Sequence, residues 1–250
     1  NVIDQINGTG FGLTMGVHSR IEERCEYLAK MSRAGNVYIN RNMIGAIVGV
    51  QPFGGRGLSG TGPKAGGPNY LQRLVKEKAS PDNVQMTNLT PDELDTHHYS
   101  GAAEQVAKLM ENSLRDEKIW RSTPLNDRVS AVRQLLAKVA TVEIIDELAD
   151  DLALTLADAR AQLNRLEKHM RKHTVLPGPT GESNTLHLEP RGCVVCYADK
   201  STSFNFWAIS IITALAAGNT VITVASELFY DEAVAFKDKF ISTGIAEGVF

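Results

Sequence analysis

The sequence predicts an α/β fold in two parts, and three observations support this prediction. Its 250 residues are 43% hydrophobic and 22% charged, a composition typical of globular chains. Helix-like and strand-like patterns alternate in residues 1–42 and again after Pro177. Residues 79–101 are polar and poor in large apolar side chains, as in a linker. We therefore expect domains at residues 1–78 and 102–250, joined by this linker.

The charge balance argues against a nucleic-acid-binding protein. The chain has 26 Lys and Arg against 29 Asp and Glu, a net charge of −3. It therefore lacks the positive charge that favours binding to the phosphate backbone of a nucleic acid. Residues 1–80 carry ten basic and five acidic side chains, whereas residues 81–250 carry 16 and 24. Two regions with different surfaces are implied, and no nucleic-acid partner is expected.

The cysteines and the hydropathy favour a cytoplasmic protein. Three cysteines are too few for a disulfide scaffold, which favours a reducing compartment. The longest apolar run, residues 206–218, contains Ser210 and Thr213 and is shorter than the roughly 18 residues that a membrane helix needs. No transmembrane segment is predicted. The N-terminal residues lack a signal sequence and read like the interior of a domain, so we expect a piece of a longer chain.

The first part is predicted to alternate helix and strand, with helices at residues 2–7 and 20–34 and strands at residues 13–17 and 36–40. Ser19 can cap the second helix and Gly35 can end it. Residues 43–70 are too rich in glycine and proline for a long helix or a regular strand, so a shaped loop is expected.

The second part is predicted to begin with three helices, at residues 102–120, 125–142 and 144–172. The third carries a leucine stripe at helical spacing that must pack against something, namely Leu148, Leu152, Leu156, Leu163 and Leu166. Strands at 185–188, 193–198 and 220–225 then alternate with helices at 204–217 and 228–242, which implies a parallel sheet. The last three residues, 248–250, read as the start of the next strand.

Three motifs suggest chemistry, and each has a plainer interpretation. Residues 55–60 match G-x-G-x-x-G but lack the preceding strand and following helix of a dinucleotide site, which favours a shaped loop. Cys193 and Cys196 lie in a predicted strand, where their sulfurs diverge, so buried inert thiols are favoured. His169 and His173 share a predicted helix face, but neighbouring cations oppose a metal ion and favour a basic helix end. No metal site is expected.

Residues 51–71 (QPFGGRGLSGTGPKAGGPNYL) closely resemble the end of an aldehyde dehydrogenase catalytic domain. With residues 7–14 (NGTGFGLT) and 35–42 (GNVYINRN), they are similar to the glutamate-semialdehyde (1-pyrroline-5-carboxylate) dehydrogenase part of the bifunctional proline-utilisation family. The resemblance implies that Gly45 and Ala46 bind the substrate α-carboxylate through backbone N–H groups, which suits an anion. It also implies that Phe53 lines the aldehyde stem, although a core Phe beneath a glycine loop is an equal alternative.

The same resemblance implies that the catalytic residues lie outside this chain. In the family, a cysteine thiolate attacks the aldehyde and NAD accepts the hydride, but the positions for the nucleophilic Cys, the general-base Glu and the main dinucleotide domain precede residue 1. The longer enzyme would use FAD for proline oxidation and NAD for the aldehyde step. We expect no catalytic residue and no bound cofactor here, and an inactive isolated chain.

The second part is similar to a noncatalytic, aldehyde-dehydrogenase-like C-terminal domain, on residues 177–184 (PGPTGESN), 190–192 (PRG) and 214–221 (ALAAGNTV). The resemblance places Ser201 at the family's oxyanion-holding Asn, Ser203 at its Pro and Val224 at its ribose-binding Lys. Serine is shorter than asparagine and valine has no donor, which predicts a structural domain without cofactor chemistry. Residual weak NAD binding is the alternative.

The partners implied are the remainder of the same polypeptide, further copies in a homo-oligomer and a small aldehyde substrate. Association with a membrane through other parts of the longer enzyme stays open. A rival hypothesis is a stand-alone interaction or oligomerisation module, whose docking face would be the leucine stripe.

Overall fold

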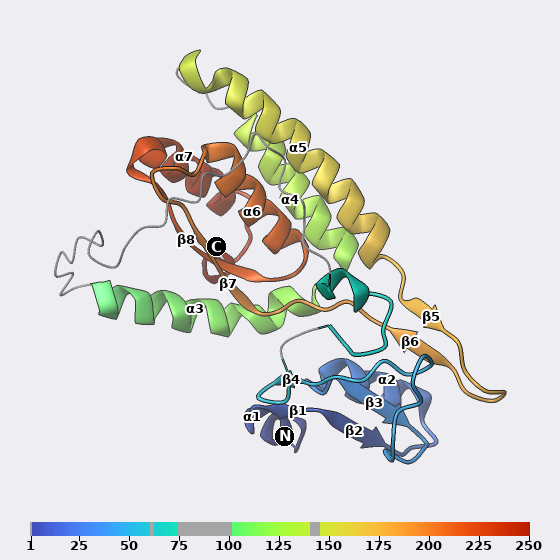
Figure 1. Cartoon of the computed structure of the whole chain (residues 1–250). Coiled ribbons are helices and arrows are strands. Elements are labelled where there is room, and N and C mark those ends of the chain that lie inside the picture. The colour runs from blue at the N-terminus through green and yellow to red at the C-terminus, as the bar shows by residue number, and fades with distance from the viewer. Residues whose placement is uncertain (1, 61–62, 75–101, 141–145) are drawn as a thin grey trace. The chain divides into compact units, whose positions relative to one another are not determined.

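In the computed structural model, the chain is described at residues 2–60, 63–74, 102–140 and 146–250 (Figure 1). The described residues divide into two compact units. The first lies within Asn1–Pro91 and includes Val175–Leu186, and the second lies within Asp92–Thr174 and His187–Phe250. The predicted linker at 79–101 lies outside the described residues. Both units combine helices with short strands, as the α/β prediction requires.

The first unit is built on a parallel strand pair with a crossover helix. After α1 (Val2–Gly8), strand β2 (Thr14–Val17) pairs in parallel with β3 (Asn36–Ile39), and α2 (Glu22–Met31) connects them. The pairing aligns Thr14 with Asn36 and Val17 with Ile39. Two parallel strands need a long crossover connection, and α2 provides it. The predicted alternation of helix and strand is confirmed.

Helix α2 is shorter than the prediction of residues 20–34. The Ser19 hydroxyl accepts the N–H of Ile21 at 3.1 Å, and Ile21 rather than Ser19 is the capping residue. At the other end, Ser32 is already extended, so Gly35 does not end the helix. Gly35 is instead required by close packing, because a Cβ there would lie 2.0 Å from the carbonyl oxygen of Gly54.

Residues 43–70 form the predicted irregular loop, held at its base by two short strands. Strand β1 (Phe11–Gly12) pairs antiparallel with β4 (Arg56–Gly57). An isolated bridge joins Phe53 to Ala65, and a 3₁₀ turn follows at Leu71–Leu74. The sequence analysis missed both short strands, because two residues are too few to show an alternating pattern.

A strand pair from the second half of the sequence completes the first unit. Strand β5 (Thr174–Leu176) pairs with β6 (Asn184–Leu186) across a seven-residue connection. The sequence analysis predicted only the second of these strands. Strand β5 was missed because it begins only two residues after the predicted end of a helix, and because its extended conformation depends on pairing with β6.

The second unit begins with three long helices, α3 (Ala102–Ser122), α4 (Leu125–Val139) and α5 (Asp146–Met170). Strand β7 (Cys193–Tyr197), helix α6 (Phe204–Ala216) and strand β8 (Thr220–Val224) then form a βαβ unit, and α7 (Tyr230–Ile241) follows (Figure 1). The two strands are parallel, with Cys193 opposite Thr220. The predicted parallel pairing of the strands at 193–198 and 220–225 across a helix is confirmed, whereas the strand predicted at 185–188 pairs with another strand, Thr174–Leu176, and does not join this sheet.

Helix α6 lies at the centre of the hydrophobic core. It is apolar on nearly all sides, and Trp207, Ile211 and Leu215 are buried along it. The indole N–H of Trp207 donates to the hydroxyl of Thr223 in β8 at 2.6 Å, and the indole of Trp120 in α3 donates to the carbonyl of Leu215 at 2.9 Å. These two bonds tie the core helix to the strand and to α3 while satisfying buried donors.

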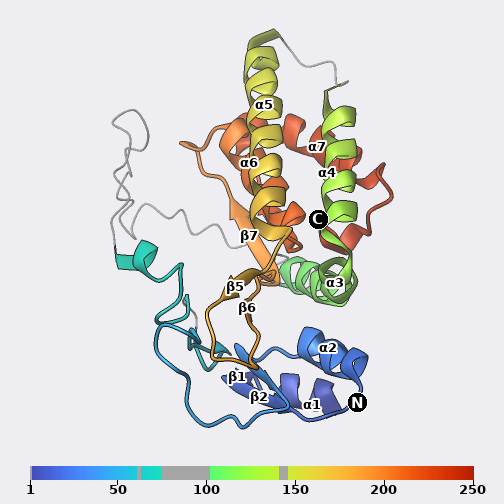
Figure 2. The same cartoon turned by 90° about the vertical axis from the view of Figure 1, so that its right-hand side faces the viewer.

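The leucine stripe of α5 is covered within the second unit. Helix α5 packs against α6 and α4, and Figure 2 shows α4 and α5 running side by side. Leu152, Leu156 and Leu163 are buried and Leu166 is partly buried, whereas the side chain of Leu148 lies outside the described part. The hypothesis that this stripe is an open docking face is therefore wrong.

The C-terminal residues do not form the expected strand. Residues Glu247–Val249 form a 3₁₀ turn, in which the N–H of Gly248 donates to the carboxylate of Asp116 on α3 at 3.1 Å. Val249 and Phe250 are buried, and the Phe250 ring packs edge-on against Phe240. Anchoring by α3 explains why an apolar tail that resembles a strand folds as a turn.

Candidate functional site

The loop at residues 43–49, called here the anchor loop, presents two adjacent free backbone N–H groups. Within the described parts of the chain, neither the N–H of Gly45 nor that of Ala46 donates to a protein atom. Gly45 has a φ of +73°, a conformation that favours glycine, and a Cβ there would meet no atom within 4 Å. Backbone conformation, rather than space, therefore favours glycine at this position.

The N–H groups on either side of this pair are already occupied. The N–H of Ile44 donates to the side chain of Asn42 at 3.1 Å, and the N–H of Ile47 donates to the side-chain oxygen of Gln51 at 3.2 Å. The backbone of Gln51 also bonds to the loop, since its N–H donates to the carbonyl of Ile47 at 2.8 Å. These bonds fix Ile44 and Ile47, and the two donors between them have no partner among the described residues.

Phe53 is fixed at the loop base by polar side chains. The Asn36 amide donates to the carbonyl of Pro52 at 2.8 Å, and its oxygen accepts the N–H of Gly54 at 3.2 Å. The Lys64 ammonium donates to Asn36 at 3.0 Å and to the carbonyl of Gly54 at 3.1 Å. These bonds hold the backbone of Phe53, whose side chain is 38% exposed, so the alternative of a core Phe does not fit the described residues.

Three polar side chains that the sequence analysis did not select lie beside the anchor loop. Glu182, in the connection between β5 and β6, accepts a hydrogen bond from Gln51 at 3.3 Å and pairs with Arg41 at 2.9 Å. Arg41 also lies over the ring of Tyr38, 5.3 Å from its centroid. Arg41 and Gln51 could have been selected because they flank the glycine loop, but Glu182 is too distant in sequence to be recognised.

The G-x-G-x-x-G segment forms a closely packed turn. The Ser59 hydroxyl accepts the N–H of Gly12 at 3.1 Å, and the Ser59 N–H donates to the carbonyl of Arg56. A Cβ on Gly55 would lie 2.6 Å from Ser59, and one on Gly57 would lie 2.5 Å from the carbonyl of Gly10. The glycines therefore allow close packing of β4, in line with the shaped-loop interpretation.

The three cysteines are free thiols, of which Cys25 and Cys196 are buried and Cys193 is half-buried. Cys193 and Cys196 lie on β7 without a disulfide, and burial raises the pKa of the Cys196 thiol. Cys25 is buried in α2. A raised pKa disfavours the thiolate of Cys196, which is the form that acts as a nucleophile.

The two histidines predicted on one helix face are separated, because α5 ends at Met170 and His173 lies beyond it. His173 instead stacks on His187, with ring centroids 5.2 Å apart. Partial burial and the neighbouring His173 lower the pKa of His187, against the opposing effect of Glu189. No group of three metal-ligating side chains exists among the described residues.

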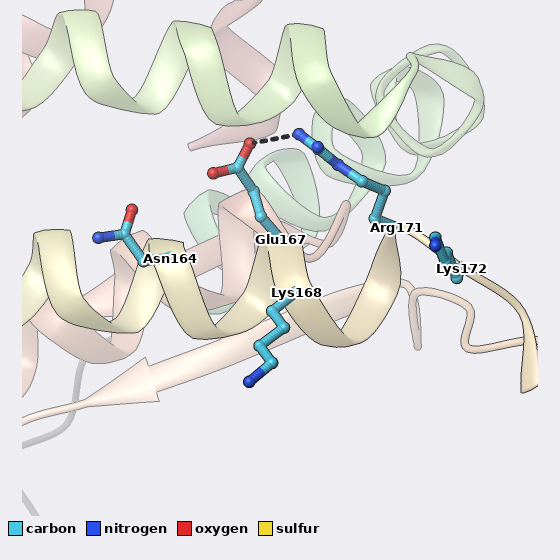
Figure 3. A pocket seen from close by; sticks show the side chains of 5 residues that line it. All are labelled: Asn164, Glu167, Lys168, Arg171 and Lys172. Carbon is cyan, nitrogen blue, oxygen red and sulfur yellow. Dashed lines mark hydrogen bonds and ion pairs between the residues drawn. The ribbon is translucent and has the colours of Figure 1, made fainter.

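A shallow pocket at the end of α5 is lined mainly by charged side chains, namely Asn164, Glu167, Lys168, Arg171 and Lys172 (Figure 3). Glu167 lies between two guanidinium groups, at 3.4 Å from Arg171 and 2.6 Å from Arg133. Its carboxylate offsets part of the positive charge of the pocket.

The cofactor-like region of the second unit uses its polar groups internally. The hydroxyl of Ser201 donates to Asp199 at 2.7 Å, and together with the Ser201 N–H it lowers the pKa of that carboxyl. Ser203 caps α6 by accepting the N–H of Phe206. Val224, 46% exposed at the end of β8, offers no side-chain donor. These residues do not fit NAD in the way that an Asn amide and a Lys ammonium would.

Comparison with known proteins shows matches along nearly the whole chain. The model of the aldehyde dehydrogenase family matches residues 1–80 and 77–250. The bifunctional protein PutA of Salmonella typhimurium is 38% identical over 237 residues, which are 95% of this chain and 14% of that protein. A 1-pyrroline-5-carboxylate dehydrogenase of Bacillus thuringiensis is 44% identical over 78 residues, which are 31% of this chain and 15% of that protein.

Solved structures show the same relationship. A structure of proline utilization A with proline bound in remote sites has a TM-score of 0.51 at 26% identity, covering 58% of this chain and 16% of that one. The chain thus spans less than a sixth of the length of the PutA proteins it matches. None of the described helices combines the length and hydropathy needed to cross a bilayer. The family model covers both units, and the chain therefore belongs to the aldehyde dehydrogenase family.

Proposed function

We propose that this chain is part of a longer, bifunctional proline-catabolic oxidoreductase. Residues 1–78 would supply the substrate anchor of its L-glutamate γ-semialdehyde dehydrogenase, and residues 102–250 would form a noncatalytic domain of the same family. The similarity to PutA and 1-pyrroline-5-carboxylate dehydrogenase proteins supports this assignment. NAD and FAD would be bound by other parts of the longer enzyme.

The observation that carries the proposal is the pair of free N–H groups at Gly45 and Ala46. They are adjacent, and the N–H groups on either side are occupied by Asn42 and Gln51. Two unoccupied amides in sequence can donate to the two oxygens of a carboxylate. The exposed ring of Phe53, which follows the anchor loop in sequence, would contact the apolar stem of the aldehyde.

Chemistry on the aldehyde would require groups from elsewhere in the longer enzyme. Oxidation needs a nucleophile and a hydride acceptor, and two of the described thiols, Cys25 and Cys196, are unsuited to the first role because they are buried. This chain would therefore bind one end of the substrate and leave the reacting carbon to other residues. Its free thiols support a reducing compartment, so we assign the longer enzyme to the cytoplasm.

Substitution of Ala46 by proline in the longer enzyme tests the anchor directly. Proline removes one N–H, and a hydrogen bond to a charged group contributes roughly 1.5–3 kcal/mol. Steady-state kinetics should show the KM for glutamate semialdehyde rising by roughly ten-fold or more, with the KM for NAD unchanged.

Substitution of Ala46 by glycine is the matched control, because it retains the N–H and should change the KM much less. Circular dichroism and thermal unfolding establish that each variant is folded. A folded proline variant with an unchanged KM for the semialdehyde would contradict the assignment of the anchor loop.

A further inference from the structure

The carboxylate of Glu182 contacts both ends of the anchor loop, although it is far from the loop in sequence. One of its oxygens lies 2.9 Å from the Arg41 guanidinium, which precedes the loop. The other accepts a hydrogen bond at 3.3 Å from the side-chain amide of Gln51, which follows the loop. Residues 41 and 51 are joined by the loop, so one acidic side chain connects its two boundaries.

Gln51 transmits this contact into the loop itself. Gln51 is only 7% exposed, so the polar atoms of its side chain need hydrogen-bond partners within the protein. The amide nitrogen donates to Glu182, while the amide oxygen accepts the N–H of Ile47. A carboxylate can only accept, so it selects the orientation of Gln51 in which the oxygen faces the loop. The reverse orientation would place two donors against each other at Ile47.

Arg41 holds the other side of the same carboxylate. The side chains of Arg41 and Glu182 are only 26% and 29% exposed, so solvent screens their attraction less than on an open surface. The guanidinium is also positioned by the ring of Tyr38 in strand β3. Through Arg41, Glu182 is therefore held near strand β3 while it orients Gln51.

We propose that Glu182 is a positioning residue that holds the anchor loop ready to bind the substrate carboxylate. The inference rests on the proposed function, since it assigns a role to a side chain that acts through Gln51 on the same loop. Ile47 follows directly after Ala46, so the bond from its N–H to Gln51 fixes the peptide next to the two free donors. Loss of the Glu182 carboxylate would weaken carboxylate binding and leave the reacting end of the substrate unaffected.

The test uses the complete enzyme that contains this chain, with Glu182→Gln and Glu182→Lys. The first variant keeps the size of the side chain but loses the charge, and the second reverses the charge beside Arg41 and offers a donor to Gln51. We expect the KM for glutamate semialdehyde to rise about two- to five-fold in Glu182→Gln, the range of a partly exposed ion pair, and further in Glu182→Lys. The kcat and the KM for NAD should stay unchanged.

A second substrate separates positioning from general structural damage. Butyraldehyde has no α-carboxylate, so its kcat/KM should be the same in both Glu182 variants as in the unmodified enzyme. Ser183→Ala changes the exposed neighbour in the same connection and is the matched control, with no expected change for either aldehyde. In a double-mutant cycle with Gln51→Ala, the effects on the KM for glutamate semialdehyde should be non-additive, because Glu182 acts through the Gln51 amide.

Hydrogen exchange at the Ile47 amide gives a readout besides activity. Exchange there should be faster in Glu182→Lys than in Ser183→Ala, because the Gln51 oxygen no longer faces the amide. Unchanged exchange together with an unchanged KM would overturn the inference, as would an equal loss of activity toward both aldehydes. If Ala46→Pro raises the KM while the Glu182 variants do not, only the positioning role fails. If Ala46→Pro also leaves the KM unchanged, the proposed function itself fails.

Discussion

The two units are held together by different interactions. The second unit has one continuous apolar core, in which Trp207 contacts Phe204, Phe229 and Phe236. The first unit buries few large apolar side chains among its described residues, such as Val17 and Tyr38. Its irregular loops depend instead on bonds from polar side chains to the backbone, of which Asn36 and Lys64 make several.

Under the proposed function, this difference would let one family fold serve two purposes. Directional bonds fix the path of a glycine-rich loop and leave selected backbone donors free, which suits a binding site. A packed apolar core stabilises a domain whether or not its surface retains any chemistry. We therefore expect substitutions in the second unit to change stability most, and substitutions in the first to change local order and binding.

The largest effect is expected from Leu163→Ala. Leu163 is fully buried between α5 and its neighbouring helices, and truncation of a buried leucine costs roughly 2–5 kcal/mol. The two tryptophans, Trp120 and Trp207, both belong to the second unit, so their fluorescence during denaturant unfolding reports on this unit.

Leu154→Ala on the same helix is the matched control, because Leu154 is 54% exposed and its loss should cost much less. Equal and small losses at both positions would mean that the leucine stripe is not buried, and the contrast between the two units would fail.

A smaller and more local effect is expected from Asn36→Ala. The substitution removes the acceptor of the Gly54 N–H and a partner of Lys64, at a cost of roughly 1–3 kcal/mol. Hydrogen exchange should become faster at Gly54, while the tryptophan-monitored transition of the second unit keeps its midpoint. A shift of that midpoint as large as that of Leu163→Ala would show that the units are not stabilised separately.

The smallest effect concerns pH and the stacked pair of His173 and His187. The pKa of His187 is lowered in the folded chain, so protonation is less favourable there than in the unfolded chain. The free energy of unfolding should therefore fall as the pH decreases through the ordinary histidine pKa of about 6.5, and should be unaffected well above it. Denaturant unfolding measured at several pH values between roughly 8 and 5 covers this pKa. In His187→Gln, the unfolding free energy should depend less on pH over this range. An unchanged slope would remove His187 as its origin.

The sequence predicted the elements better than their boundaries. The apolar pattern of α6 and the βαβ order of the second unit were sufficient, since both follow from local periodicity. Strand β5 was not predicted because it has only three residues and follows directly after a predicted helix end. The final 3₁₀ turn was not predicted because it depends on Asp116, which is far away in the sequence. The same limit applied to function, where Gly45, Ala46 and Phe53 came from resemblance. Glu182 could be found only from its contacts.

Calorimetric titration of the chain with NAD tests most directly the claim that the second unit retains the family fold without its cofactor chemistry. Val224 offers no donor and Ser201 is engaged by Asp199, so we predict no saturable heat up to about 1 mM NAD, a concentration that would reveal binding free energies beyond about −4 kcal/mol. Saturable binding with a dissociation constant of about 1 mM or tighter would contradict the account.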